Sequence, residues 1–316
     1  LGALSAWVYG TGAGDPLPLL FATTGTNGKT SVSHLLEGIL DQLGVVTGLS
    51  STAERHIAGE VIVSRLTTPE ASEMHALLAL MRERDVEAVA VEVSAQALSR
   101  HRVDGIRFDV AGFTNLSHDH LDDYADMEEY FEAKLPLFRP DRASRGVVCL
   151  DSPSGAIVVE RADIPVVTVG TPSIASDPEA AARADWVVVI DDERASGTTF
   201  TLTGPAGVLT TTVPVIGPHM AANAALAIVM LLEGGYAWDR IVAALHRDGG
   251  IDAQLPGRTQ LVSGDTGPVV FVDFGHSPDA FEKTLAAVRR VTPGKVLMLF
   301  GADGDRDASK RFDMAR

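Results

Sequence analysis

The segment TGTNGKT, residues 24–30, constrains the fold more than any other feature of the sequence. The apolar run at residues 17–22 before it predicts a strand, and apolar side chains at helical spacing over residues 32–43 predict a helix. A glycine-rich turn in this position is typical of a phosphate-binding loop, because its N–H groups and the positive end of the helix face a polyphosphate. Lys29 would reach the phosphates and the Thr30 hydroxyl would bind Mg²⁺. The alternative is a turn that binds nothing, and Thr23 stands where the common motif has its first glycine.

Strand-like and helix-like stretches alternate along most of the chain, which predicts an α/β fold with a mostly parallel sheet flanked by helices. A β-hairpin is expected over residues 197–216, around a Gly-Pro-Ala-Gly turn. The other expected strands are residues 45–49, 86–93, 108–116, 146–150 and 166–170, and the other expected helices begin at Thr68-Pro69 and cover residues 127–138, 220–232 and 238–245.

The sequence Leu255-Pro256-Gly257-Arg258 breaks this pattern, which predicts a domain boundary after residue 256. Beyond it, strands at residues 269–274 and 295–300 on either side of a helix at residues 278–291 predict the start of a second, Rossmann-like domain.

The 316 residues include 26 Lys and Arg against 42 Asp and Glu, a formal net charge of −16. This charge argues against duplex nucleic acid or an anionic membrane as the main partner, although a few lysines can still bind a phosphate. Cys149 is the only cysteine, so no intrachain disulfide can form, and no apolar run approaches the ~20 residues of a membrane span. The first residues lack the pattern of a signal peptide. We therefore expect a cytoplasmic monomer.

Several polar residues stand at or just after expected strands. Glu92 ends an apolar strand, where a second Mg²⁺ ligand would lie, and a solvated strand end is the alternative. The segment TNLSHDHLDD groups His118, Asp119 and His120, which would bind a metal or substrate or form an exposed polar loop; its spacing is not that of a zinc site. Lys134 lies in a helical pattern, and its spacing alone predicts a surface lysine.

The last segment holds two further candidates. Asp273 and His276 follow a strand and precede a helix, with a turn that binds nothing as the alternative. Arg306 is suited to binding a carboxylate through two parallel hydrogen bonds, although a surface ion pair would equally account for it.

In this order, the segments resemble the Mur ligase family, and within it the UDP-N-acetylmuramoyl-tripeptide synthetase type. The matching pieces are TGTNGKT, TTPE, EVSAQAL, RVDGIRFDVAGFTNLSHDHLD, MEEYFEAKLPLF, PGR, VDFGHSPDA and FGADGDRD. The resemblance implies that residues 1–15 are the tail of an N-terminal UDP-binding domain, residues 16–256 the central ATP-binding domain and residues 257–316 the incomplete start of a C-terminal ligase domain.

The resemblance also implies the site. The residues implied to bind ATP are Gly25, Thr26, Asn27, Gly28, Lys29, Thr30, Asn223, Arg258, Asp273 and His276. Thr30 and Glu92 are implied to bind a first Mg²⁺ and His120 a second, with Lys134 carbamylated by CO₂ and bridging toward that second metal. The implied catalytic set is Lys29, Glu92, His120 and Lys134. The UDP-muramoyl-dipeptide would be held by Thr67, Thr68, Ser94 and Arg102, and Arg306 would lie near the incoming amino acid.

Four places in the sequence depart from the pattern of the family. Ser94-Ala95-Gln96 stands in place of Ser-Ser-His, and His118 in place of a basic residue. Asp122-Asp123-Tyr124 replaces DYH, and Met220 replaces an Asn, while Asn223 is kept.

The implied reaction is ATP-dependent amide-bond formation through an acyl phosphate, in the synthesis of peptidoglycan precursors. TTPE and RVDG favour a muramoyl acceptor. One alternative is a related ligase with a folylpolyglutamate or amino-acid-polymer acceptor. The other is a nucleotide-binding homologue that no longer catalyses.

Overall fold

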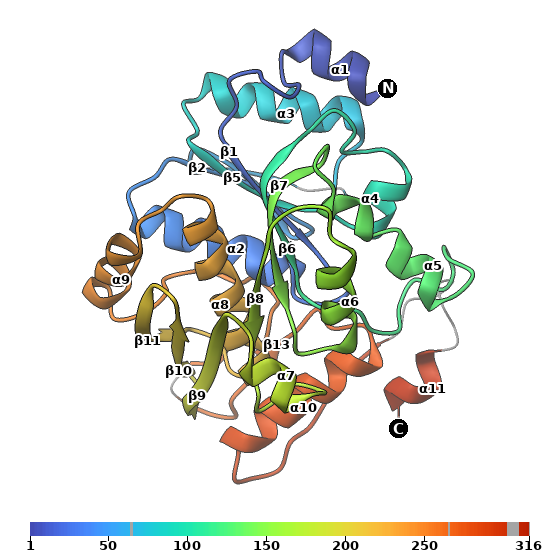
Figure 1. Ribbon diagram of the computed structural model, residues 1–316. Helices are drawn as coiled ribbons and strands as arrows, with labels where there is room; N and C mark the ends of the chain where they lie inside the picture. The colour runs from blue at the N-terminus through green and yellow to red at the C-terminus, as the bar shows by residue number, and fades with distance from the viewer. Residues whose placement is uncertain (64–65, 265, 302–309, 316) are drawn as a thin grey trace.

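The computed structural model describes residues 1–63, 66–264, 266–301 and 310–315, and a large twisted sheet runs through its centre (Figure 1). The eleven strands of this sheet have the order β11-β10-β9-β8-β7-β6-β1-β5-β2-β3-β4. All neighbours from β9 to β2 are parallel, whereas the two strands at each edge are added in antiparallel fashion. The mostly parallel α/β sheet predicted from the sequence is therefore confirmed.

The parallel strands are the ones that the apolar runs predicted, with β9 in addition. In chain order the strands of the sheet are β1 (Leu19–Thr24), β2 (Thr47–Ser50), β3 (Glu54–Ile57), β4 (Glu60–Val63), β5 (Ala88–Glu92), β6 (Phe108–Phe113), β7 (Ala143–Cys149), β8 (Val166–Gly170), β9 (Trp186–Arg194), β10 (Gly197–Gly204) and β11 (Gly207–Val213). The hairpin expected around the Gly-Pro-Ala-Gly turn is confirmed as β10 and β11.

Helices cover both faces of the sheet. One face packs against α2 (Lys29–Gln42), α8 (Pro218–Glu233) and α9 (Trp238–Arg247). The other packs against α3 (Ala71–Glu83), α4 (Ala95–Ser99), α5 (Met127–Glu132), the 3₁₀-helix η1 (Leu135–Phe138) and α6 (Pro153–Arg161). Helix α8 is apolar around nearly its whole circumference because it lies between the sheet and α2.

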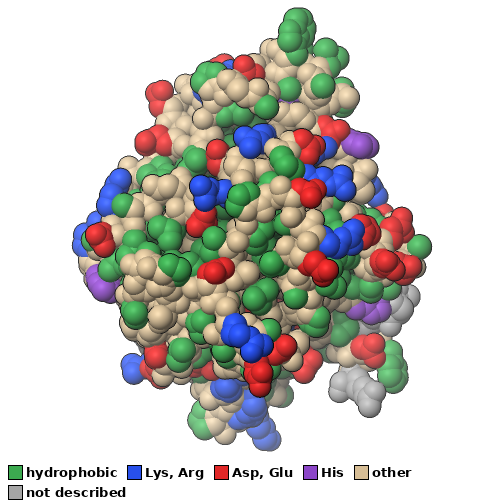
Figure 2. All heavy atoms as spheres, in the orientation of Figure 1, with side chains coloured by type: hydrophobic (Ala, Val, Ile, Leu, Met, Phe, Trp, Pro, Cys, Tyr) green, Lys and Arg blue, Asp and Glu red, His purple; other side chains and the backbone are tan. Residues whose placement is uncertain are grey.

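Two helices, α1 and α7, lie outside these layers. Helix α1 (Gly2–Tyr9) packs on α3 and leaves Leu4 and Trp7 exposed. Figure 2 shows hydrophobic side chains at the top of the molecule, the end where Figure 1 places α1. The short helix α7 (Pro178–Ala182) contacts β8. No helix among the described residues is long and apolar enough to cross a membrane.

The segment after residue 256 forms a small two-stranded antiparallel sheet, β12 (Gln260–Leu261) and β13 (Phe271–Val272), followed by α10 (Pro278–Val291) and α11 (Lys310–Ala315). Helix α10 matches its prediction, and its Arg290 pairs with Glu193 of β9 at 2.7 Å. The strand predicted at residues 295–300 is wrong: these residues are irregular, and Leu297 and Leu299 are almost fully exposed. A strand needs a partner for its backbone groups, and none of the described strands pairs with this segment.

Two helix predictions need correction. Helix α3 begins at Ala71 and not at Pro69, because the Thr68 hydroxyl does not cap it but donates to the carbonyl of Glu92 at 2.8 Å. The helix predicted over residues 127–138 divides into α5 and η1. Pro136 has no N–H to continue the α-helix, and the chain tightens into a 3₁₀ turn just after Lys134.

Candidate nucleotide and metal site

The sheet places three functional loops side by side. Strand β1 lies between β5 and β6, with Thr23 opposite Glu92 and Thr24 opposite Phe113. Because parallel strands end at the same edge of a sheet, the phosphate loop, Glu92 and the loop after β6 meet there. A cavity of about 520 Å³ opens at this edge, toward the segment that carries Arg258 and His276.

The phosphate loop needs glycine at two positions. Gly25 has φ +144° and a Cβ there would come within 1.9 Å of the Thr114 hydroxyl; Gly28 has φ +90° and a Cβ would meet the Asn223 side chain at 2.7 Å. The loop after β6 holds this backbone from behind, since Thr114 Oγ1 donates to the carbonyl of Asn27 at 2.6 Å. The loop is thus a fixed turn that opens α2.

Two amines, of the half-buried Lys29 and the buried Lys134, converge on one carbonyl oxygen of this loop. Lys29 Nζ donates to the carbonyl of Gly25 at 3.1 Å and to that of Thr26 at 2.8 Å, and Lys134 Nζ donates to Gly25 at 3.2 Å. Burial lowers the pKa of Lys29. Burial, and then the nearby charge of Lys29, lower the pKa of Lys134 well below its usual value.

Lys134 is therefore not the surface lysine that its spacing predicted. Its side chain is 1% exposed and its Nζ lies 3.9 Å from the centre of the Tyr130 ring. A lowered pKa increases the fraction of the amine that is uncharged, and only an uncharged amine can react with CO₂. The environment therefore fits the carbamylation that the resemblance implies.

Glu92 and Thr30 offer oxygen atoms to the same cavity. Glu92 is fully buried; Thr52 donates to its Oε2 at 2.8 Å, while its Oε1 has no hydrogen-bond partner among the described residues. The Thr30 hydroxyl accepts from Arg258 Nη2 at 2.6 Å. A buried, unpartnered carboxylate oxygen and a hydroxyl are ligands that Mg²⁺ prefers, so these two residues fit the cation.

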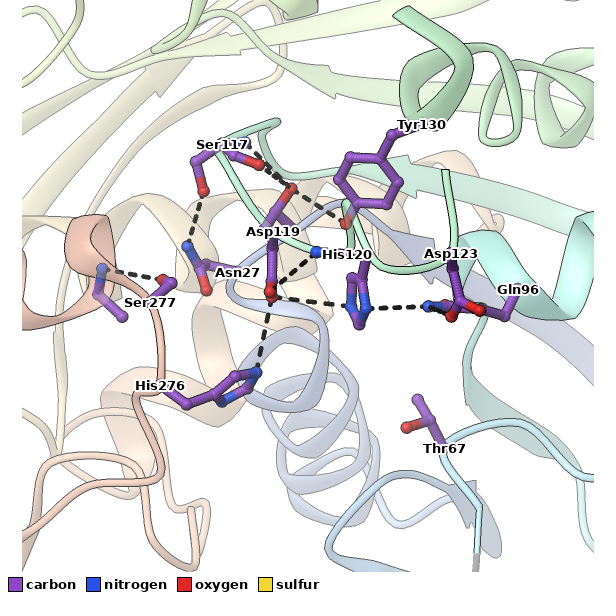
Figure 3. Close-up of polar contacts among 12 residues, drawn as sticks. Asn27, Thr67, Gln96, Ser117, Asp119, His120, Asp123, Tyr130, His276 and Ser277 are labelled. Carbon is purple, nitrogen blue, oxygen red and sulfur yellow. Dashed lines mark hydrogen bonds and ion pairs between the residues drawn. The ribbon is translucent and has the colours of Figure 1, made fainter. Parts of the chain in front are cut away.

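His120, Asp119 and His276 form a row across the cavity (Figure 3). His120 Nε2 lies 3.7 Å from Asp119 Oδ2, and His276 Nε2 lies 3.6 Å from the same oxygen. Burial lowers the pKa of His120 to about 4, so its ring is neutral near pH 7. The described residues contain no group of three His, Cys, Asp or Glu side chains that could hold a metal by themselves.

The residues expected to hold the acceptor lie on the other side of Glu92. Thr67 Oγ1 lies 2.9 Å from Thr52 Oγ1, whose single hydroxyl hydrogen goes to Glu92, and Ser94 caps α4 by accepting from Ala97 N. Arg102 Nη2 pairs with Glu70 at 2.8 Å, and its buried Nε has no partner among the residues described. Thr67, Ser94 and Arg102 line the cavity, whereas Thr68 lies behind it.

The remaining residues expected to bind ATP are brought to the cavity by α8 and by the segment that includes the turn after β13. Asn223 lies against Gly28, next to Met220. Asp273 holds the turn itself, because its two carboxylate oxygens accept from Thr259 N and Gly275 N, both at 2.7 Å. Arg258, from the same segment, lies over the Phe274 ring at 5.1 Å.

The cavity brings together most of the predicted site. Its lining includes Thr26, Asn27, Gly28, Lys29, Thr30, Thr67, Glu92, Ser94, Arg102, His120, Asn223, Arg258, Asp273 and His276. Gly25 and Lys134 support it from behind, and Arg306 lies outside the described residues. Sequence reasoning gave no role to Thr52, Gln96 or His219, which also line it. Only Gln96 carried a signal, as a departure from the family pattern.

The family model of the Mur ligase middle domain matches residues 23–231, and that of the Mur ligase glutamate ligase domain matches residues 257–316. The chain belongs to the Mur ligase family. It is 61% identical, over 315 residues, to a UDP-N-acetylmuramyl-tripeptide synthetase of Leifsonia xyli subsp. xyli, covering 99% of this chain and 60% of that protein. It is 41% identical, over 319 residues, to a UDP-N-acetylmuramoyl-L-alanyl-D-glutamate--2,6-diaminopimelate ligase of Streptomyces avermitilis, with the same coverage of 99% and 60%. The chain thus spans about 60% of the length of these curated relatives.

Solved structures show the same fold. A UDP-N-acetylmuramoyl-L-alanyl-D-glutamate--2,6-diaminopimelate ligase superposes with a TM-score of 0.72 at 24% identity, covering 95% of this chain and 59% of that one. FolC of E. coli, in complex with DHPP and ADP, superposes with a TM-score of 0.67 at 21% identity, covering 93% of this chain and 70% of that one. At these identities the likeness establishes the fold alone.

Proposed function

We propose that this chain carries the ATP-binding and phosphoryl-transfer site of a ligase that adds an amino acid to UDP-N-acetylmuramoyl-L-alanyl-D-glutamate. The observation that carries the proposal is the convergence of Lys29 and Lys134 on the Gly25 carbonyl, beside the buried carboxylate of Glu92. The 61% identity to a tripeptide synthetase, over nearly the whole chain, supports the acceptor.

The reaction begins when a carboxylate of the acceptor attacks the γ-phosphorus of ATP. The bond to the β-phosphate oxygen breaks, and ADP and an acyl phosphate are formed. The amine of the amino acid then attacks the acyl carbon, inorganic phosphate leaves, and an amide bond with one released proton remains. This scheme requires no side-chain nucleophile, because catalysis would rest on positioning and on charge stabilisation.

Each part of the site has a role in this scheme. The N–H groups of the loop and the Lys29 ammonium would hold the β- and γ-phosphates. Mg²⁺, when bound, would neutralise phosphate charge; Thr30 and Glu92 would hold one ion, and His120 with carbamylated Lys134 a second. Arg258 would leave the Thr30 hydroxyl and turn its charge toward ATP. Thr67, Ser94 and Arg102 would orient the acceptor.

The ligase reaction is tested by phosphate release from the longest polypeptide that contains this chain. Release should require ATP, the UDP-muramoyl-dipeptide and an amino acid together, and the amino acids offered should include 2,6-diaminopimelate, which the name of the Streptomyces relative specifies. Phosphate release that is independent of the dipeptide would contradict the proposal.

Two alternatives are separated by the same assay. Release with a folate or an amino-acid polymer as acceptor would indicate the folylpolyglutamate or polymer type, whose fold FolC shares. A nucleotide-binding homologue without catalysis would bind ATP but release no phosphate with any acceptor, and Lys134→Ala would then behave like the parent protein.

A further inference from the structure

Gln96 contacts a central residue of the site, although the proposed function gives it no role. It lies on α4, two residues after Ser94, at the position where the family pattern has His. Its Nε2 lies 3.0 Å from His120 Nδ1 and 3.2 Å from Asp123 Oδ2 (Figure 3). Arg100 donates to the other oxygen of Asp123 at 2.8 Å.

These contacts decide where the proton of the His120 ring lies. An amide nitrogen only donates hydrogen bonds, and each of its two hydrogens has an acceptor here, one on Asp123 and one on His120. His120 Nδ1 must therefore accept, so the single proton of the neutral ring is on Nε2. That nitrogen faces Asp119 Oδ2 at 3.7 Å.

We propose that Gln96 is a positioning residue that sets the tautomer of His120, holding the proton on Nε2 while the Gln96 amide is bonded to Asp123. The use of this tautomer in catalysis rests on the proposed function, but the position of the proton does not. A ring nitrogen binds a metal ion only through an unprotonated lone pair, so His120 with its proton on Nε2 cannot bind a cation on the Asp119 side.

Rotation of the Gln96 amide would reverse this state. Its Oε1 would then face His120 and accept a hydrogen bond from Nδ1–H. For this, Nε2 would lose its proton to water and Nδ1 would take up another, so the charge of the ring would not change. The Nε2 lone pair would be free to bind a cation. The rotation would break the Gln96–Asp123 bond and bring two oxygens together, since Arg100 keeps Asp123 in place.

The proposal is tested by long-range ¹H–¹⁵N imidazole spectra of this chain, with chelator present and at about pH 8, above the usual pKa of histidine. The His120 signals are assigned by their loss in His120→Asn. We expect the wild-type proton on Nε2. Gln96→Met, which offers no polar partner, should abolish this preference. Gln96→Glu, which only accepts, should move the proton to Nδ1.

The matched control is Gln42→Met. Gln42 lies on α2, far from His120 in sequence, and it also donates to an aspartate, Asp248, at 3.0 Å. It should leave the His120 spectrum unchanged. A wild-type proton on Nδ1, or a Gln96→Glu spectrum identical to the wild-type one, would overturn the proposal. Neither measurement requires ATP or turnover, so a failed ligase assay would contradict the proposed function and leave this result standing.

Discussion

Replacement of Lys134 by Met separates the chemical role of this residue from its structural one. Lys134 is 1% exposed, and its polar contact is the bond to the Gly25 carbonyl at 3.2 Å. Met has a similar length and no charge, so it can fill the same space beside Tyr130 without desolvating an ammonium group. We expect Lys134→Met to fold normally and, under the proposed function, to lose ligase activity, since no amine is left to carbamylate.

The expected stability follows from opposing terms. The substitution removes a hydrogen bond that contributes about 1 kcal/mol. In the fraction of molecules whose amine is charged, it also removes a cation–π contact with Tyr130 that contributes about 1–2 kcal/mol. It also removes the cost of burying the amine, which is about 1.4 kcal/mol for each unit by which the pKa is lowered. We therefore expect the free energy of unfolding to stay within about 1 kcal/mol of the wild type or to rise, whereas the cavity left by Lys134→Ala should cost about 2–5 kcal/mol.

The pH dependence gives the sharper test. The folded-state pKa of Lys134 is lowered below the unfolded value, so between the two values the unfolded chain binds more protons and wild-type stability rises with pH. Lys134→Met lacks this contribution. Its stability relative to the wild type should therefore be highest near neutral pH and decrease as pH rises toward about 10.4. Lys29 is present in both proteins and largely cancels in the difference.

The assay is urea unfolding of both proteins over this pH range, in buffer depleted of CO₂, with Lys295→Met as the control at an exposed lysine. The control should show no such trend. A loss of more than about 2 kcal/mol in Lys134→Met at neutral pH, which is the scale of a disrupted core, or a stability difference that does not change with pH, would refute this reasoning.

Three further predictions follow from the same coordinates. Gly25→Ala should lower the free energy of unfolding by at least about 1–3 kcal/mol and abolish ATP binding, because φ is +144° and the added Cβ would clash with Thr114. The control Gly294→Ala, where the added Cβ would meet open space, should have neither effect. Equal unfolding curves for the two variants would contradict this prediction. Glu92→Gln should weaken Mn²⁺ binding about tenfold or more by electron paramagnetic resonance, with the fold retained, and unchanged affinity would exclude Glu92 as a ligand. The hydrogen bond to Glu37 raises the pKa of His56. The stabilisation that His56 provides should therefore be present below about pH 6.5 and disappear as pH rises through the raised pKa. The urea midpoints of His56→Gln and the wild type should differ at low pH and converge at high pH.

Local patterns predicted the elements whose signals are local. The strand–loop–helix around residues 24–30 and helix α10 were found because apolar spacing and turn residues lie next to each other in the sequence. The edge strands β3 and β4 were missed because every residue of β4 is exposed and no apolar alternation marks it. The strand predicted at residues 295–300 failed for the opposite reason: its apolar run is clear, but no described strand pairs with it.

The site was predicted as a set of residues and not as an arrangement. Lys134 was identified by resemblance alone. The Gly25 carbonyl that it contacts lies 109 residues away in the sequence, so no local pattern could predict this buried contact. The Gln96–His120 contact joins helix α4, which follows β5, to the loop after β6, and no spacing rule relates the two. What the sequence could not supply was the meeting of strand ends at one edge of the sheet, which follows from the order in which β5, β1 and β6 pair.

Electrostatics connects the two lysines to the order of events at the site. Burial lowers the pKa values of Lys29, Lys134 and Arg258 together, so the cavity holds cations at an energetic cost that a bound polyphosphate would offset. Burial is the first cause of the lowered pKa of Lys134 and the charge of Lys29 the second, and the same polyphosphate would weaken the second and so increase the charged fraction, which does not react with CO₂. Under the proposed function, carbamylation of Lys134 should therefore be favoured before ATP binds.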